Sequence, residues 1–396
     1  MQNIFKSQFR LDPNIVFLNH GSYGSTPIPV QDNQNKWRAI LENQPCQFLG
    51  EDYFNEIIIA RQALANYLDC DKDSVVYTIN PTTAINMIIP SLEFGSGDEI
   101  LSTNHEYGAL VRTWDYHCQK RGAAFIRQPV ELPIQSKDVI LEQFLAGVTS
   151  NTKIIFISQM TSPTALIFPV KEICDFARQN GILSIVDGAH IPGHCPLSIS
   201  ELNPDIYTGA CHKWMCAPKG SAFLYMNKSL HSQIKPFIIS WGYKPENERE
   251  SKFLDYFQWT GTCDPTAWLA TPAAIQFQKN HQWNNVQENC HQLLSNIRTE
   301  IQDLFNSEPI CSDSSEWYRQ MAAIEIPTTN PDELKTQLLQ DYSIEIPVLT
   351  WNNKSYIRIS IQAYNTEQDG HRLVEALTNI LKTTQLFNSD YHQITG

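Results

Sequence analysis

Apolar and polar positions follow two alternating patterns along the first two thirds of the chain. Short apolar runs rich in β-branched residues predict strands at 75–79, 99–102, 153–158 and 182–186. Between these runs, apolar residues at helical spacing predict helices that begin at 81 and cover 107–120 and 171–178. The alternation predicts an α/β fold in which helices cover a mostly parallel sheet.

The pattern changes after residue 270. Apolar residues at helical spacing predict one long helical stretch over 271–305, and the residues beyond it predict short strands at 322–326 and 356–361 with helices at 332–340 and 367–382. This part is expected to be a smaller α+β domain. We therefore predict an N-terminal arm at 1–15, a large domain at 16–270 and a small C-terminal domain at 271–396.

The segment 241–258 is polar, charged and interrupted by Pro245. Such a segment is typical of a surface loop, and it is predicted to cover a site or to reach a neighbouring molecule.

Composition and charge exclude several classes of protein. The 396 residues, 42% of them hydrophobic, can bury a large core, and the net charge of −13 disfavours a nucleic-acid binder. No apolar run reaches the roughly 18 residues of a membrane span. The first residues lack the apolar core of a signal peptide, so we expect a cytoplasmic protein without nucleic-acid or membrane partners.

The ten cysteines do not form a disulfide or metal pattern. In a chain of this length without an export signal, they are expected to be reduced and mostly buried. Cys211 and Cys216 lack a second ligand pair at a spacing that would suit zinc, so we assign them to packing and expect no metal.

An acid and a lysine follow two of the apolar runs. Asp187 ends the strand at 182–186, and Lys213 follows the apolar-to-polar passage 206–212. In an open α/β sheet, ligands bind outside the carboxyl ends of the strands. A lysine that forms a Schiff base and an acid that keeps a pyridine nitrogen protonated are the minimum that pyridoxal phosphate requires. Most lysines lie on the surface, but the two residues together favour cofactor chemistry.

Several polar groups near these strand ends are suited to the same cofactor. Asn80-Pro81-Thr82-Thr83 lies between a strand and a helix, where it would bind a phosphate or act as an ordinary N-cap. His212 is a second candidate for the phosphate. His190 is a candidate to form a hydrogen bond with the phenolic oxygen of the cofactor ring, although a single histidine is more often structural.

His105 and Tyr107 follow the strand at 99–102, where either ring would stack on a flat ligand or pack in the core. Tyr107 is also a candidate proton donor. Arg358 lies between Ile357 and Ile359, and a buried arginine needs an anionic partner. That partner is either a structural carboxylate or the carboxylate of a substrate.

The motifs occur in an order that resembles the class V aminotransferase family of fold-type I pyridoxal-phosphate enzymes. They are Asn80-Pro81-Thr82-Thr83, His105-Glu106-Tyr107, Thr161-Ser162-Pro163-Thr164, Asp187-Gly188-Ala189-His190, His212-Lys213-Trp214, Thr260-Gly261-Thr262 and Arg358-Ile359-Ser360 with Tyr364-Asn365. The resemblance covers nearly the whole chain. The segments 17–24, 259–262 and 346–348 are similar to the isopenicillin N epimerase-like branch. The fold it implies has a large cofactor-binding domain with a mostly parallel sheet and a smaller α+β domain.

The resemblance implies roles for the residues around the cofactor ring. Lys213 would form the Schiff base, and Asp187 would hold the pyridine nitrogen. His190 or Ser162 would contact the ring hydroxyl.

The resemblance also implies which residues would bind the phosphate of the cofactor. Thr82, Thr83 and His212 would bind this group within one subunit. Thr262 would reach the phosphate of the other subunit, so a homodimer is implied.

A third group would face the substrate. Arg358 would bind the α-carboxylate of an amino acid, and Asn19 and His20 are further substrate-binding candidates. His105 or Tyr107 would cover the exposed face of the ring, and Tyr107 would also take part in catalysis.

The sequence departs from the family pattern of cysteine desulfurases, whose nucleophilic cysteine lies shortly before the arginine strand. Here the segment 348–354 holds no cysteine, and Cys311 precedes a different strand, which disfavours persulfide chemistry. We therefore expect an epimerase-like enzyme that acts at the α-carbon of an amino acid. The alternatives are a transaminase, a C–S lyase of cysteine, cystine or a cysteine-sulfoxide derivative, and a non-catalytic cofactor-binding relative. Retention of Lys213, Asp187 and Arg358 argues against the last.

Overall fold

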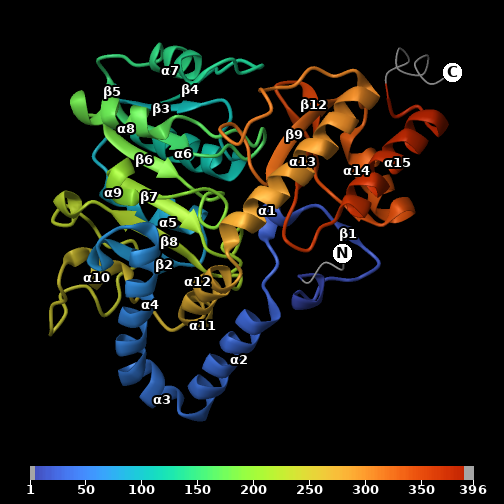
Figure 1. Cartoon of the computed structure of the whole chain (residues 1–396). Coiled ribbons are helices and arrows are strands. Elements are labelled where there is room, and N and C mark those ends of the chain that lie inside the picture. The colour runs from blue at the N-terminus through green and yellow to red at the C-terminus, as the bar shows by residue number, and fades with distance from the viewer. Residues whose placement is uncertain (1–4, 388–396) are drawn as a thin grey trace.

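The computed structural model describes residues 5–387, and its larger part is built on a seven-stranded sheet covered by helices (Figure 1). In spatial order the strands are β2 (Val75–Thr78), β8 (Ala222–Met226), β7 (Ile206–Ala210), β6 (Leu183–Asp187), β5 (Thr152–Ser158), β3 (Glu99–Thr103) and β4 (Ala124–Gln128). Strands β7, β6, β5, β3 and β4 are parallel, and β8 is antiparallel to both of its neighbours. The predicted α/β fold with a mostly parallel sheet is therefore confirmed.

Both faces of this sheet are buried. Successive side chains of a strand point to opposite faces, and Ile185 and Val186 of β6 accordingly belong to two different hydrophobic clusters, in which each is fully buried. Burial on both faces explains why the central strands read as continuous apolar runs rather than as alternating ones.

Helices of this larger part connect and cover the strands. They are α1 (His20–Tyr23), α2 (Ile28–Asn43), α3 (Pro45–Gln47), α4 (Tyr53–Leu68), α5 (Pro81–Ile88), α6 (Gly108–Arg121), α7 (Lys137–Leu145), α8 (Val170–Gln179), α9 (Ile199–Leu202), α10 (Lys252–Phe257), α11 (Thr266–Leu269) and α12 (Thr271–Asn280). Gly181 has a φ of 67° just beyond α8, and this left-handed conformation costs glycine little strain.

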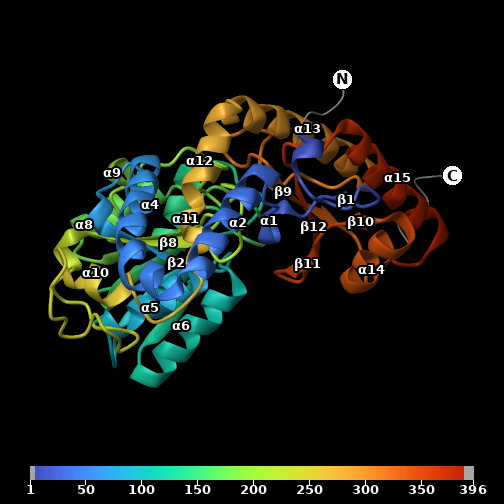
Figure 2. The ribbon, with the colours of Figure 1, turned by 90° about the horizontal axis from the view of Figure 1, so that it is seen from below.

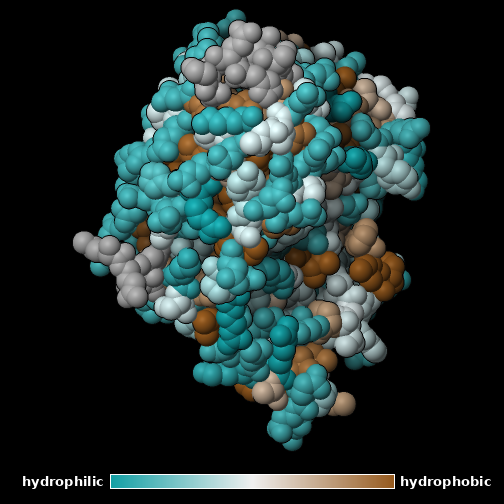
Figure 3. All heavy atoms as spheres, turned by 90° about the vertical axis from the view of Figure 1, so that its right-hand side faces the viewer, coloured by the Kyte–Doolittle hydropathy of each residue, from teal (hydrophilic) through white to brown (hydrophobic). Residues whose placement is uncertain are grey.

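The C-terminal part has its own antiparallel sheet, in the order β11 (Val348–Trp351), β12 (Lys354–Ser360) and β9 (Met321–Ile326). Helices α13 (Trp283–Phe305), α14 (Pro331–Tyr342) and α15 (Glu367–Thr383) accompany it, and Figure 2 shows this part at one end of the molecule. The surface that it presents is mostly hydrophilic (Figure 3).

The start of the described chain crosses to the C-terminal part. Strand β1 (Val16–Phe17) pairs with β10 (Ile344–Glu345), and Asn19 bridges to Ser360. The sequence predicts these residues in the large domain, because no sequence pattern reveals a partner more than 300 positions away. The three domain ranges stay a prediction, although Val16, Phe17 and Asn19 pair with residues of the C-terminal part.

Two sequence-based expectations are wrong in detail. The expected loop at 241–258 contains helix α10, because Phe253, Leu254 and Phe257 form a buried apolar face within the polar segment. The expected helix over 271–305 is two helices, because Gln282 adopts a left-handed conformation with a φ of 49° between them. Within the described range, no helix combines the length and hydropathy that a membrane span requires.

Candidate functional site

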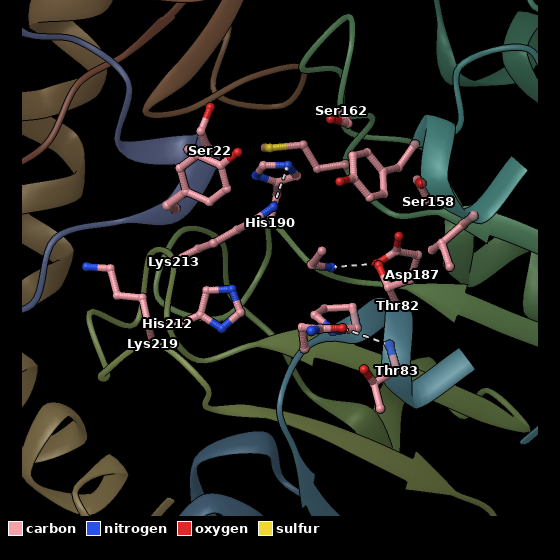
Figure 4. Close-up of a pocket in the computed structure, with 18 of the residues that line it drawn as sticks. Ser22, Thr82, Thr83, Ser158, Ser162, Asp187, His190, His212, Lys213 and Lys219 are labelled. Atoms are coloured by element: carbon pink, nitrogen blue, oxygen red, sulfur yellow. Dashed lines mark hydrogen bonds between the residues drawn. The ribbon is translucent and has the colours of Figure 1, made fainter. Parts of the chain in front are cut away.

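A cavity of about 760 Å³ lies at the carboxyl edge of the parallel sheet (Figure 4). Because parallel strands end at the same edge, residues that are far apart in the sequence converge there. Its wall includes Ser22, Tyr23, Thr82, Thr83, Tyr107, Ser158, Met160, Ser162, Asp187, His190, His212, Lys213, Lys219 and Arg358.

Lys213 lies in the turn after β7 with its amine in the cavity. Its Nζ is 3.3 Å from Nε2 of His190, and Figure 4 shows the two side chains pointing toward each other. Burial, followed by the nearby charge of Arg358, lowers the pKa of Lys213 to about 8. The amine is therefore neutral at a much lower pH than an ordinary lysine, which is what a nucleophilic lysine requires.

Asp187 ends strand β6 and is buried at the base of the cavity. Its Oδ1 accepts a hydrogen bond of 2.9 Å from the backbone N–H of Ala189, and burial raises the pKa of its carboxyl group. The following residue, Gly188, packs so closely that an added Cβ would lie 1.9 Å from the Tyr207 hydroxyl. A carboxylate in this position is suited to a cationic N–H group of a ligand.

The N-terminus of α5 forms another wall. Asn80 caps this helix by accepting a 2.7 Å hydrogen bond from the backbone N–H of Thr83, so Thr83 offers the cavity its hydroxyl rather than that N–H. The Thr82 side chain and the positive end of the helix dipole complete an environment for an anion.

His212 and Lys219 line the same cavity. Nδ1 of His212 lies 2.8 Å from the carbonyl oxygen of Ser221 and donates to it, since a carbonyl only accepts. Burial lowers the pKa of His212 to about 4, so its Nε2 is the ring nitrogen left for a ligand. Lys219 adds a flexible positive charge close to this point.

Arg358 reaches the cavity from β12 of the C-terminal part. Its Nη1 donates to the backbone oxygen of Ser162 at 2.5 Å and to the Ser162 hydroxyl at 3.2 Å, and its Nη2 donates to the Ser22 hydroxyl at 3.2 Å. Nε has no hydrogen-bond partner, and burial lowers the pKa of the guanidinium to about 10. Among residues 5–387 no carboxylate forms an ion pair with it, so the buried charge has room for an anionic ligand.

The structure separates the two aromatic candidates after β3. Tyr107 lines the cavity and is 47% exposed. His105 is fully buried behind the wall, where its ring nitrogens lie 2.8 Å from the Thr164 hydroxyl and 2.8 Å from the Val130 carbonyl oxygen. Its ring packs against Trp351 at 4.3 Å between centroids. Because His105 is packed in the core and Tyr107 lines the cavity, Tyr107 is the better placed of the two to cover a cofactor ring, and that role stays a prediction.

Asn19 and His20 do not line the cavity. The Nε2 atom of His20 is 3.1 Å from the Lys213 carbonyl oxygen, and Asn19 accepts a hydrogen bond from the Ser22 hydroxyl. Both residues therefore support cavity residues rather than face a ligand. Gly24 brings this segment close to the lysine turn, since an added Cβ would lie 2.4 Å from the His212 carbonyl oxygen.

Thr262 is exposed in a bend on the surface and lies outside the cavity wall of its own chain. Its predicted role at the phosphate of a second subunit stays a prediction.

Ser158, Lys219 and Glu106 have no role in the sequence-based predictions: the first two line the cavity, and Glu106 is hydrogen-bonded to Ser158 outside the cavity wall. Ser158 ends β5 beside Asp187, and the strand-end rule that identified Asp187 applies equally to it. Lys219 had no signal beyond its closeness to Lys213 in the sequence. Glu106 accepts from the hydroxyls of Thr103 and Ser158, and burial raises its pKa to about 7.

The donor set fits pyridoxal phosphate. The cavity combines a lysine of lowered pKa, a buried carboxylate, an anion-binding helix end and an arginine whose Nε lacks a partner. Within the described part of the chain, no group of three or more His, Cys, Asp or Glu side chains is suited to a metal ion.

Comparison with known proteins shows which sequences and structures this chain resembles. The family model described as aminotransferase class-V matches residues 46–373. The chain is 32% identical over 391 residues to an isopenicillin N epimerase of Amycolatopsis lactamdurans, covering 95% of this chain and 98% of that protein. It is 24% identical to a probable chloroplastic L-cysteine desulfhydrase of Arabidopsis thaliana, covering 94% of this chain and 84% of that protein.

Among solved structures, a mutant of C-DES with glycine covalently linked to its PLP cofactor matches with a TM-score of 0.80 and 20% identity. The match covers 94% of this chain and 99% of that chain. C-DES is described as a cystine C–S lyase in a second solved structure. At this identity the likeness shows the fold.

Proposed function

The chain belongs to the aminotransferase class-V family, and from this premise we propose that it is a pyridoxal-phosphate enzyme acting at the α-carbon of an amino acid through Lys213. One observation carries the proposal: Lys213, Asp187 and Arg358 meet around one cavity although they come from separate parts of the chain. The pKa of Lys213 is lowered, the Asp187 carboxylate is buried, and Nε of Arg358 lacks a hydrogen-bond partner, as their proposed roles require.

Bound cofactor supplies an electron sink that stabilises negative charge on the α-carbon of an attached amino acid. Asp187 would hold a proton on the pyridine nitrogen, and its burial strengthens that interaction. Thr82, Thr83 and His212 would bind the phosphate, with Lys219 as an additional positive charge. Lys213 would take a proton from the α-carbon at Nζ, because its neutral form is accessible near pH 8.

The substrate would be held by its carboxylate. Arg358 offers a planar, charged group whose Nε lacks a partner, and Ser22 and Ser162 fix its orientation. An epimerase needs a group that returns a proton to the other face of the carbon, and Tyr107 on the cavity wall is our candidate for that group. The full-length similarity to isopenicillin N epimerase supports epimerisation as the preferred reaction.

A C–S lyase is the second candidate. The similarity to an L-cysteine desulfhydrase supports it, and one base at Lys213 would suffice for β-elimination. No cysteine is part of the described cavity wall, so neither reaction would use a persulfide on the protein.

The test begins with borohydride reduction of the cofactor-loaded enzyme and peptide mapping. The label is expected on Lys213, and a label on Lys219 of the same cavity would overturn the assignment. Candidate amino acids are then incubated in deuterated water, with product chirality and release of sulfide and pyruvate measured in parallel. Deuterium at the α-carbon with inverted configuration supports the epimerase. Pyruvate with sulfide from cysteine, or pyruvate with cysteine persulfide from cystine, supports the lyase.

A further inference from the structure

The side chain of His190 receives a hydrogen bond from a group that can only donate. Nε1 of Trp214 is 3.3 Å from Nδ1 of His190, and both side chains are buried. An indole N–H has no acceptor function, so Nδ1 of His190 must be the acceptor. In a neutral imidazole the hydrogen is then on Nε2, the nitrogen that faces Lys213.

His190 is kept neutral by its surroundings. Burial, and then the charges of Lys213, Arg358 and His194, lower its pKa well below the usual range. A doubly protonated ring would also have no lone pair for the Trp214 N–H. The hydrogen bond from Trp214 and the nearby positive charges therefore both favour a neutral imidazole at His190.

The indole of Trp214 is itself held in place. His194 stacks on it, with 4.1 Å between ring centroids and 24° between planes. Nδ1 of His194 lies 2.9 Å from the His190 carbonyl oxygen, to which it donates, and its Nε2 accepts a 2.8 Å hydrogen bond from the backbone N–H of Gln320. Both ring nitrogens of His194 thus have a fixed role, and the stack is anchored to the residue preceding β9.

The fixed ring has a consequence for the lysine. Nε2 of His190 is 3.3 Å from Nζ of Lys213, and a nitrogen that carries a hydrogen cannot accept one from an ammonium group. It can donate to a neutral amine. A proton on Lys213 therefore competes with the hydrogen bond from Trp214, because His190 cannot accept from both.

We propose that Trp214 is a positioning residue that holds His190 as an Nε2 donor and thereby disfavours a proton on Lys213. The titratable and charged groups near Lys213 are His190, His212, Arg358 and Asp187. Arg358 acts in the same direction as the proposed effect, and Asp187 acts against it. The value of the effect to the enzyme rests on the proposed function, since a neutral Lys213 is what a cofactor aldehyde requires. The ring state is assigned from a contact within the protein, the hydrogen bond from Trp214.

The test uses cofactor-free protein with isotope-labelled lysine, in which the NMR signal of the Lys213 Cε is titrated with pH. Loss of the signal in Lys213→Arg assigns it. Trp214→Phe keeps the aromatic stack but removes the N–H, and the midpoint of Lys213 is expected to rise by about one pH unit, which corresponds to about 1.4 kcal/mol. Trp283→Phe is the matched control, because that buried indole donates to the Gly193 carbonyl at 3.2 Å instead.

A double-mutant cycle shows whether the effect passes through His190. In a His190→Leu background, which offers neither a donor nor an acceptor at this position, Trp214→Phe is expected to leave the midpoint unchanged. An unchanged midpoint in the single variant, or an equal rise in both backgrounds, overturns the proposal. If Trp214→Phe does not fold, neutron diffraction of the wild type above about pH 8 decides: deuterium on Nε2 supports the proposal and deuterium on Nδ1 overturns it.

The outcome of the Lys213 titration can be distinguished from the outcome of the borohydride test of the proposed function. Failure of borohydride to label Lys213 would reject the cofactor assignment and leave the ring state of His190 unaffected. A normal label together with an unchanged midpoint in Trp214→Phe would reject only the role of Trp214.

Discussion

Replacing Arg358 with lysine separates charge from geometry at the substrate end of the cavity. The substitution keeps a positive charge near Lys213, so the pKa of Lys213 should stay close to 8 and the cofactor should still bind. It removes the planar guanidinium, whose three nitrogens offer hydrogens in fixed directions. Arg358→Lys is therefore expected to weaken the binding of amino acids and not that of the cofactor.

The magnitude follows from the contacts of Arg358. Its Nη1 and Nη2 are oriented by Ser162 and Ser22, and its Nε lacks a partner. A carboxylate held by two parallel hydrogen bonds would keep about one of them with lysine. A hydrogen bond to a charged group is worth about 1.5–3 kcal/mol. The dissociation constant of an amino acid should thus rise by roughly 10- to 150-fold.

The assay compares ligands that differ only in the carboxylate. Alanine is paired with ethylamine, and cysteine with cysteamine, and each is titrated against the visible absorbance of the loaded enzyme. Wild type should prefer the amino acid in each pair, and Arg358→Lys should lose most of that preference. Arg298→Lys is the matched control, because this buried arginine lies beside Asp313 at 3.6 Å and away from the cavity.

Two outcomes would refute the reasoning. Equal binding of alanine and ethylamine by wild type would mean that no carboxylate site exists. Loss of cofactor from Arg358→Lys with preserved preference would mean that the arginine is structural.

Three further predictions concern the cofactor end of the cavity. Asp187→Asn should keep the fold but reduce activity by more than about tenfold, because a charge-assisted hydrogen bond is lost. Melting temperature and turnover are measured together, and turnover at the wild-type rate would contradict the role of Asp187. Because the pKa of Lys213 is lowered to about 8, its amine is protonated below that pH, so cofactor uptake by the cofactor-free enzyme should slow about tenfold per pH unit below about pH 8 and level off above it. A rate without pH dependence would be inconsistent with Lys213 as the nucleophile. The active unit should be a two-fold dimer, and Thr262→Val should weaken cofactor binding. Sedimentation at low protein concentration tests the dimer. A monomer that is active and loaded with cofactor would rule out a shared site.

The residues that could be predicted from the sequence are those whose position follows from chain direction. Asp187 ends an apolar strand and Lys213 follows the next one, and the carboxyl ends of parallel strands necessarily share an edge. Arg358 was identified by a different argument, that of a charge within an apolar strand. Neither argument requires knowledge of a distant partner.

The residues that could not be predicted depend on such partners. His105 and Tyr107 are two positions apart. The ring contacts with Trp351 and Phe168 and the hydrogen bonds to Thr164 and Val130 place His105 in the core. The roles of the ring nitrogens of His190 depend on Trp214, which follows it by 24 positions. Local sequence fixes neither contact, because both arise from how β-strand ends and the C-terminal part pack together.

The same packing determines what the cavity can select. The cofactor end is built from the seven-stranded sheet, whereas Arg358 belongs to β12 of the C-terminal part. The distance between Arg358, the proposed carboxylate site, and Lys213 is therefore set by the contacts across these two parts, which include Arg358 with Ser162 and Gln320 with His194. On the proposed function, a substrate whose carboxylate binds Arg358 would have its α-carbon near Lys213 only while those contacts hold. Substitutions at this boundary should consequently change the choice of reaction before they change cofactor binding.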